Sequence, residues 1–270
     1  MSRIEEILEK AARMREGEKN GEKSRKISPP GSKVPGVVRQ ARIENPNLVT
    51  IVDPDSPTAE EYRKLKSMVV KLTEMDDFRN MLMVTSAIGG EGKSVTSLNL
   101  AITLAQEYDH TVLLVDADLR QPSLNDYLGI HSEIGLTDCL VDGVGIGSAL
   151  IKTGIGGLVF LPSGRKVSNP GELLSSNRMK EIVKELKHRY PDRYVIFDAP
   201  PVLPFAEVLS VGALLDGIIF VVREGVTPED NMKDAVTMLK DNNILGVVYN
   251  AAETVPLSDY YNYSHYYQNR

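Results

Sequence analysis

A glycine-rich segment at residues 87–94 carries the residue types that bind phosphate groups. It reads Ala-Ile-Gly-Gly-Glu-Gly-Lys-Ser, and it stands between an apolar run that ends at Ser86 and a helical pattern that begins at Val95. Glycines let consecutive backbone N–H groups turn toward phosphate oxygens, and the start of a helix adds the positive end of its dipole. The lysine of such a loop reaches the β- and γ-phosphates, and the serine hydroxyl takes a position on Mg²⁺. The sequence therefore predicts a nucleotide-binding loop whose contacts come from Gly89, Gly90, Glu91, Gly92, Lys93, Ser94 and Val95.

Two apolar runs end in aspartates, which supply the carboxylates that such a site needs. Asp116 and Asp118 follow one run, and Asp198 follows another. Parallel strands carry their carboxyl ends at the same edge of a sheet, so we expect these acids beside the loop. Because Mg²⁺ accepts one or two carboxylates together with waters and phosphates, Asp118, Asp198 and Ser94 are the candidate metal ligands. A glycine turn with a surface lysine is the alternative for the loop alone, and it leaves both acidic strand ends unexplained.

The elements that would hold these residues follow the pattern of βαβ units. Helical patterns lie near 58–75, 94–107, 177–189, 204–213 and 228–240. Several of the runs between them are apolar at consecutive positions, which is typical of strands covered by helices on both faces. The sequence predicts an α/β fold of the P-loop NTPase type with a mostly parallel sheet of about seven strands. These are expected at Leu48–Val52, Met81–Ser86, Thr111–Asp116, Leu158–Leu161, Tyr194–Asp198, Gly217–Val222 and Ile244–Asn250.

Composition excludes several classes of protein. The formal net charge of −6 argues against a nucleic acid as partner of the whole chain. A single cysteine, Cys139, excludes an internal disulfide and a cysteine-based zinc site. The apolar runs are far shorter than the roughly 20 residues of a membrane span, and the first residues do not form a signal peptide. We therefore expect a cytoplasmic protein.

The chain divides into four predicted parts. Residues 1–15 have helical spacing of apolar residues, and 16–47 form a linker rich in Lys, Arg, Gly, Ser and Pro that we expect to be mobile. Residues 48–250 are the predicted P-loop domain, and 251–270 form a tyrosine-rich tail. The first helix and the basic linker are open to two interpretations. One is a docking segment for a partner or a membrane surface, and the other is a frayed terminal helix on a solvated tether.

The tail holds five of the eleven tyrosines in the chain, with no apolar periodicity connecting them. This pattern favours an exposed segment that is open to modification over a core element. An aromatic terminus that stacks on a neighbour is the alternative. The candidate acceptors are Tyr260, Tyr261, Tyr263, Tyr266 and Tyr267.

Over residues 48–270 the chain resembles the bacterial P-loop tyrosine kinases, which are autophosphorylating enzymes of exopolysaccharide and capsule export. The resemblance rests on the loop, on the Asp-Ala-Asp-Leu-Arg motif at 116–120, on the Asp-Ala-Pro-Pro motif at 198–201 and on the tyrosine cluster. It implies transfer of the γ-phosphoryl group of Mg-ATP to tail tyrosines, most simply those of a neighbouring subunit. It also implies a catalytic set of Lys93, Asp116, Asp118 and Asp198, with Asp116 as the base, although Asp116 and Asp118 could exchange roles. Arg120 and Asn250 are the further nucleotide contacts that it implies.

Two other functions stay open at this point. One is an ATP-dependent switch of the partition type, and the other is a nucleotide-sensing adaptor without kinase activity. Partition-type relatives have a lysine just before the two glycines, and Ile88 occupies that place here. This residue argues against the switch, but it does not exclude the adaptor.

The resemblance also implies partners. Glu60, Arg63 and Lys66 match an oligomerisation element that would assemble a homo-oligomer, such as a ring, with lysine in place of its last arginine. An ordinary surface ion pair between Glu60 and Lys64, four positions apart on a solvated helix face, is the equal alternative. A transmembrane polysaccharide chain-length regulator is the expected activator, and it would hold the protein peripherally at the inner membrane. A tyrosine phosphatase is expected as a further partner.

Overall fold

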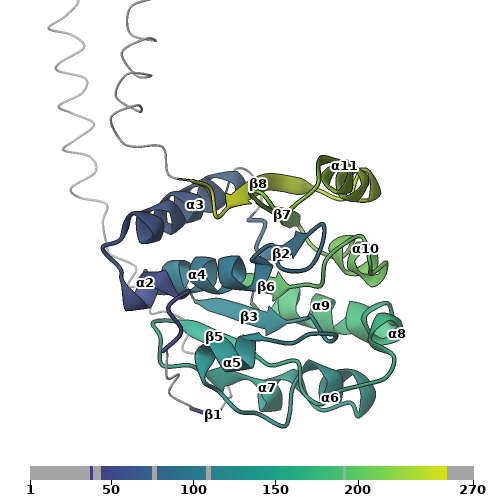
Figure 1. Cartoon of the computed structure of the whole chain (residues 1–270). Coiled ribbons are helices and arrows are strands. Elements are labelled where there is room, and N and C mark those ends of the chain that lie inside the picture. The colour runs from purple at the N-terminus through teal and green to yellow at the C-terminus, as the bar shows by residue number, and fades with distance from the viewer. Residues whose placement is uncertain (1–36, 39–43, 75–77, 108–110, 191–192, 254–270) are drawn as a thin grey trace, which may run out of the picture. The chain divides into compact units, whose positions relative to one another are not determined.

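The fold is built on one sheet of eight strands in the order β1-β4-β5-β3-β6-β2-β7-β8 (Figure 1). The computed structural model describes residues 37–38, 44–74, 78–107, 111–190 and 193–253. Neighbouring strands are parallel except for the antiparallel pair β4 and β5. The strands are β1 Val37–Val38, β2 Met81–Ser86, β3 Val112–Asp116, β4 Ile151–Lys152, β5 Leu158–Leu161, β6 Tyr194–Asp198, β7 Gly217–Arg223 and β8 Ile244–Asn250.

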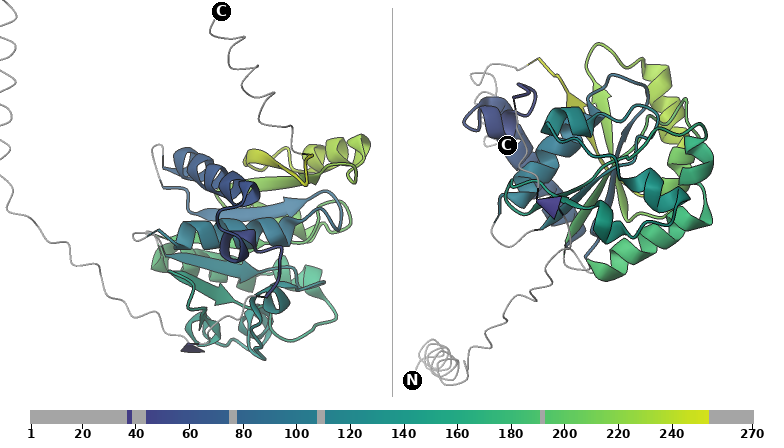
Figure 2. Two further views of the ribbon diagram at one scale, coloured as in Figure 1. Left: turned by 60° about the vertical axis from the view of Figure 1, so that its left-hand side comes forward. Right: turned by 90° about the horizontal axis from the view of Figure 1, so that it is seen from below.

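Helices lie on both faces of this sheet. In Figure 2 the blue helices α3 and α4 lie on one side of the strands, and the green helices α9, α10 and α11 lie on the other. The helices are α2 Val49–Val52, α3 Pro57–Thr73, α4 Lys93–Ala105, α5 Leu124–Leu128, α6 Leu136–Val141, α7 Ile146–Ala149, α8 Pro170–Leu174, α9 Asn177–Arg189, α10 Glu207–Gly212 and α11 Glu229–Met238. This arrangement confirms the predicted fold class.

The central strands are buried along their whole length, as their sequences predicted. Every residue of β2, β3 and β6 is buried. Their side chains pack with the apolar residues of α4, among them Leu98, Ile102 and Leu104. Because helices exclude water from both faces, these strands need no alternation of polar and apolar residues.

The strand predicted at Leu48–Val52 is wrong, because Val49–Val52 form the short helix α2. The run is rich in β-branched residues, but contacts to α4 decide its conformation. The Asn99 side chain accepts hydrogen bonds from the Thr50 N–H at 3.2 Å and from the Thr50 hydroxyl at 2.9 Å. The Asn99 amide also donates to the Asn47 carbonyl at 2.9 Å. Tertiary contacts therefore override local β propensity.

Helix α3 begins with a serine cap. The Ser56 hydroxyl accepts a hydrogen bond from the Ala59 N–H at 3.2 Å, and Pro57 occupies the first turn.

Strands β1 and β4 were not predicted, because each is two residues long. β1 lies inside the range predicted as linker, whereas residues 1–36 and the tail tyrosines lie outside the described residues. Within the described ranges, no helix combines the length and the apolar character that crossing a bilayer requires.

Replacing Asn99 with alanine is expected to lower the free energy of unfolding by about 2 kcal/mol, because buried polar groups of Thr50 lose their partner. Urea unfolding followed by circular dichroism measures this change. Asn169→Ala is the matched control, since the exposed Asn169 side chain bonds to the exposed side chain of Glu172 among the described residues, and its effect should stay below roughly 0.5 kcal/mol. Equal midpoints for the two variants would contradict the role assigned to Asn99.

Candidate active site

The glycine-rich loop joins β2 to α4 in the conformation that its glycines make accessible. Gly90 and Gly92 have φ angles of 83° and 90°, a region that residues with a side chain rarely adopt. A Cβ atom at Gly89 or Gly90 would meet no described atom within 4 Å, so the chain leaves the space beside these residues open. At Gly92 a Cβ would lie 2.1 Å from Asn250 Nδ2, so only glycine fits.

Helix α4 begins at Lys93, at the end of this loop. Ser94 and Val95 therefore belong to its first turn, whose N–H groups have no acceptors within the helix. Such N–H groups, together with the positive end of the helix dipole, stabilise an anion placed before them. The local structure thus agrees with the predicted phosphate-binding loop.

The two acidic strand ends meet as the parallel sheet predicted. Asp116 and Asp198 are register partners on the adjacent strands β3 and β6, and both are fully buried. The Lys93 ammonium lies 2.7 Å from Asp118 Oδ2 and 3.3 Å from the Ser94 hydroxyl. Strand order and the loop therefore bring Lys93, Ser94 and the acids to one edge of the sheet.

Several carboxylate oxygens at this edge have no hydrogen-bond partner within the described residues. They are Asp116 Oδ1 and both oxygens of Asp198. The other Asp116 oxygen accepts the Leu124 N–H at 3.3 Å. Buried polar atoms without partners are rare and destabilising in native proteins. Oxygens of this kind beside a serine hydroxyl suit a hard cation such as Mg²⁺.

Burial and mutual repulsion of the acids set the protonation of the site. Burial raises the pKa of Asp116 well above 3.8, and the charge of Asp198 raises it further. Burial also raises the pKa of Asp198, although the charge of Lys93 and the nearby hydroxyls of Ser94 and Ser97 act in the opposite direction. Burial alone would lower the pKa of Lys93, but the nearby charges of Asp198 and Asp118 outweigh it and the net pKa is raised. Lys93 therefore stays positively charged at neutral pH.

The acids do not form a metal cage by themselves. Among the described residues, no group of three or more His, Cys, Asp or Glu side chains has the arrangement to hold a metal ion. Mg²⁺ bound with a nucleotide needs only one or two carboxylates, because phosphates and waters complete its octahedral shell. The site therefore fits a cation that arrives with a triphosphate.

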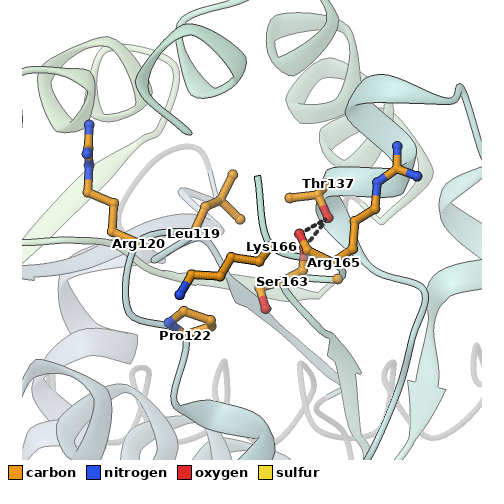
Figure 3. A pocket seen from close by; sticks show the side chains of 8 residues that line it. Leu119, Arg120, Pro122, Thr137, Ser163, Arg165 and Lys166 are labelled. Carbon is orange, nitrogen blue, oxygen red and sulfur yellow. Dashed lines mark hydrogen bonds between the residues drawn. The ribbon is translucent and has the colours of Figure 1, made fainter. Parts of the chain in front are cut away.

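Arg120, a predicted nucleotide contact, is engaged elsewhere in this structure. Its Nε lies 2.7 Å from Glu207 Oε1, and its guanidinium lies 4.2 Å from the centre of the Phe205 ring. Arg120 also lines a cavity of about 150 Å³. Figure 3 shows Lys166 extending toward Pro122 and the Thr137 hydroxyl bonded to the carbonyls of Ser163 and Arg165.

Asn250, the predicted adenine contact, uses its side-chain amide to hold the loop. Its Nδ2 donates to the Glu91 carbonyl at 2.8 Å, and its Oδ1 accepts the Ala251 N–H at 2.9 Å. Thr227 and Arg223, which sequence reasoning missed, also contact the loop, through Glu91 and the Gly90 carbonyl. They are 136 and 133 positions away along the chain, and no motif marks them.

The predicted oligomerisation residues are bonded within the chain. Arg63 Nε lies 2.7 Å from Glu60 Oε2, and both terminal nitrogens of Arg63 donate to the Pro54 carbonyl at 2.9 Å. Lys66 forms an ion pair with Glu107. The structure thus shows surface ion pairs on α3, but Glu60 pairs with Arg63, and Lys64 pairs with Glu61 at 2.7 Å. Oligomerisation through α3 stays a prediction.

Comparison with known proteins agrees with this geometry. The family model described as an AAA domain matches residues 80–223, from the start of β2 to the end of β7. Tyrosine-protein kinase YwqD of Bacillus subtilis (strain 168) is 34% identical over 217 residues, which are 79% of this chain and 90% of that protein. Tyrosine-protein kinase ptk of Acinetobacter johnsonii is 33% identical over 184 residues, which are 68% of this chain but 23% of that longer protein. The kinase domain of the Escherichia coli tyrosine kinase ETK superposes with a TM-score of 0.70 at 27% identity, covering 80% of this chain and 86% of that domain.

The fold and the loop between β2 and α4 thus define a nucleotide-binding domain of the P-loop class. Within that class, the chain belongs to the family of bacterial tyrosine-protein kinases.

Replacing Asp116 with asparagine is expected to stabilise the nucleotide-free protein above the raised pKa of the native aspartate. There the ionised carboxylate is buried next to Asp198, and one unit of pKa elevation corresponds to about 1.4 kcal/mol of lost stability. The gain should be at least roughly 2 °C in Tm and should vanish as the pH falls through the folded-state pKa toward 3.8, where the aspartate is protonated in both states.

Scanning calorimetry over this pH range checks the sign. Asp142→Asn, at a half-exposed acid paired with Arg165 outside the site, is the control and should show no such gain. A Tm for Asp116→Asn below that of the native protein above neutral pH would contradict the proposed electrostatics.

Proposed function

We propose that the chain is a Mg-ATP-dependent tyrosine autokinase that phosphorylates the tyrosines at 260–267. The observation that carries this proposal is the Lys93–Asp118 ion pair beside the unpartnered oxygens of Asp116 and Asp198, at the glycine-rich loop. Membership of the tyrosine-protein kinase family gives the reaction class, and the tyrosine cluster supplies acceptors.

In the proposed reaction a tyrosine oxygen forms a bond to the γ-phosphorus while the bond from that phosphorus to the bridging β–γ oxygen breaks, which releases ADP. The phenol proton passes to Asp116, whose raised pKa makes it a stronger base than an ordinary aspartate. Lys93 leaves Asp118 for the phosphates, and the N–H groups of the loop bind the same oxygens. Mg²⁺, held by Ser94, Asp118 and Asp198, would supply further neutralisation of the transferring phosphoryl group.

The side chains of Arg120 and Asn250 are bonded to other residues, which argues against direct contact with the nucleotide. The Arg120 guanidinium would have to leave Glu207 and Phe205, and the Asn250 amide would have to leave the Glu91 carbonyl. We therefore propose that they act through the surrounding loops.

Exchanging Lys93 for methionine is expected to reduce transfer of label from γ-labelled ATP to the protein by at least about 100-fold, because the main positive charge at the phosphates is lost. Mass spectrometry of the terminal peptide locates the phosphate. Lys184→Met, at an exposed position on α9, is the matched control and should retain the label. Truncation after Pro256 should abolish labelling while ATP binding persists.

The outcomes separate the rival functions. Label on the truncated chain would move the acceptor elsewhere in the protein. Release of free phosphate without labelled protein would favour the partition-type switch, and binding without turnover would favour the nucleotide-sensing adaptor.

We further propose a homo-oligomer and a transmembrane polysaccharide chain-length regulator as activator, in the service of exopolysaccharide export, with a tyrosine phosphatase reversing the reaction. Family membership supports these partners, and in ptk the matched region is part of a longer protein. Each phosphotyrosine adds roughly −1.5 to −2 charges, so phosphorylated tails should be repelled from an acidic site and loosen the assembly.

Arg63→Ala is expected to convert the oligomer to a monomer, which light scattering at matched concentrations measures. Arg189→Ala is the control, because Arg189 forms a similar surface pair with Glu185 on α9. A native protein that is monomeric at every concentration, with and without membrane extract, would contradict oligomerisation through α3.

A further inference from the structure

Glu91 is an acidic residue inside a loop that binds anions, and its side chain is fully buried. One carboxylate oxygen accepts the Ile88 N–H at 2.6 Å, and the other accepts the Thr227 hydroxyl. The carboxylate is therefore occupied by donors from the loop itself and from the turn after β7. This arrangement explains how a negative charge is accommodated in a phosphate-binding loop.

Further contacts fasten the same loop to the ends of β7 and β8. Asn250 donates to the Glu91 carbonyl at 2.8 Å, and Arg223 donates to the Gly90 carbonyl at 3.1 Å. The absent side chain of Gly92 makes the space that the Asn250 amide fills. The loop is thus held by contacts to two strand ends that follow it by more than a hundred residues.

Such contacts matter because this loop is rich in glycine. Glycine loses more conformational freedom on ordering than any other residue, and Gly90 and Gly92 must keep φ angles near 83° and 90°. A loop that must be ordered when the ligand arrives binds more weakly than one that is already held in the bound shape. Contacts that order the loop beforehand therefore raise affinity without touching the ligand.

We propose that Glu91, Thr227 and Asn250 are positioning residues that hold the loop in its phosphate-binding conformation, with the Glu91 carboxylate as their centre. The proposal rests on the nucleotide-binding part of the proposed function, and it does not depend on where the phosphoryl group goes. It also links the loop to the strand that leads into the C-terminal segment, since Ala251 N–H bonds to the Asn250 side chain.

The test compares Glu91→Ala with Glu91→Gln in the full chain. Alanine removes both acceptor oxygens, so the Kd for ADP should rise about tenfold or more. Glutamine keeps one acceptor for Ile88 and can donate to the Thr227 hydroxyl, so it should restore the Kd to within about threefold of the native value. Hydrogen exchange of the nucleotide-free chain should show the Ile88 amide protected in the native protein and in Glu91→Gln, and exposed in Glu91→Ala.

Thr227→Val tests the second contact by exchanging the hydroxyl, which bonds to Glu91 and also accepts the Arg223 N–H at 3.1 Å, for a methyl group. It should raise the Kd for ADP by roughly fivefold. Thr237→Val is the matched control, because the exposed Thr237 hydroxyl bonds to Lys233 within α11. The Kd of this control should equal that of the native protein.

The results also separate this proposal from the proposed function. An Ile88 amide still protected in Glu91→Ala, or an unchanged Kd in that variant, would overturn the positioning role. A Kd for ADP in Glu91→Gln as high as that in Glu91→Ala would also overturn it, in favour of a role for the charge itself. A native chain that binds ADP without phosphorylating its tail would contradict the autokinase proposal and leave the positioning role unaffected.

Discussion

The site depends on an imbalance of charge in a place with little water. Lys93 supplies one positive charge to three buried carboxylates, and among the described residues its direct ion pair is with Asp118. Asp116 Oδ1 and both carboxylate oxygens of Asp198 have no hydrogen-bond partner within the described ranges. Unpaired charge in such surroundings destabilises the folded state. A protein retains that arrangement only when a bound cation, a proton or a ligand relieves it.

Strand topology enforces this arrangement. Because β3 and β6 are adjacent and parallel, their last residues, Asp116 and Asp198, must lie side by side. β2 lies on the other side of β6 and delivers the loop to the same edge. Helices on both faces exclude water from the strands, and their close packing holds the backbone at Asp116 and Asp198 so that the two carboxylates cannot move apart. The repulsion between Asp116 and Asp198 therefore follows from the strand order and does not depend on the conformation of any one loop.

The sequence predicted those parts whose geometry follows from local pattern. The loop motif, the long buried strands and the convergence of the acids at one edge all follow from runs of apolar residues that end in glycine or aspartate. The helix at Val49–Val52 could not be predicted from local pattern, because hydrogen bonds to Asn99, which is far away along the chain, determine its conformation. The pairing of Arg120 with Glu207 was equally hidden, since the partner lies 87 positions away and belongs to no motif.

The most direct test of the account is isothermal titration calorimetry of the native chain with ADP, in Mg²⁺ and in excess chelator. If the unpartnered carboxylates bind a cation that accompanies the phosphates, Mg²⁺ should raise the affinity for ADP at least about tenfold. Equal affinities in the two buffers would contradict the account, because they would mean that the acids at the ends of β3 and β6 serve no metal-bound nucleotide.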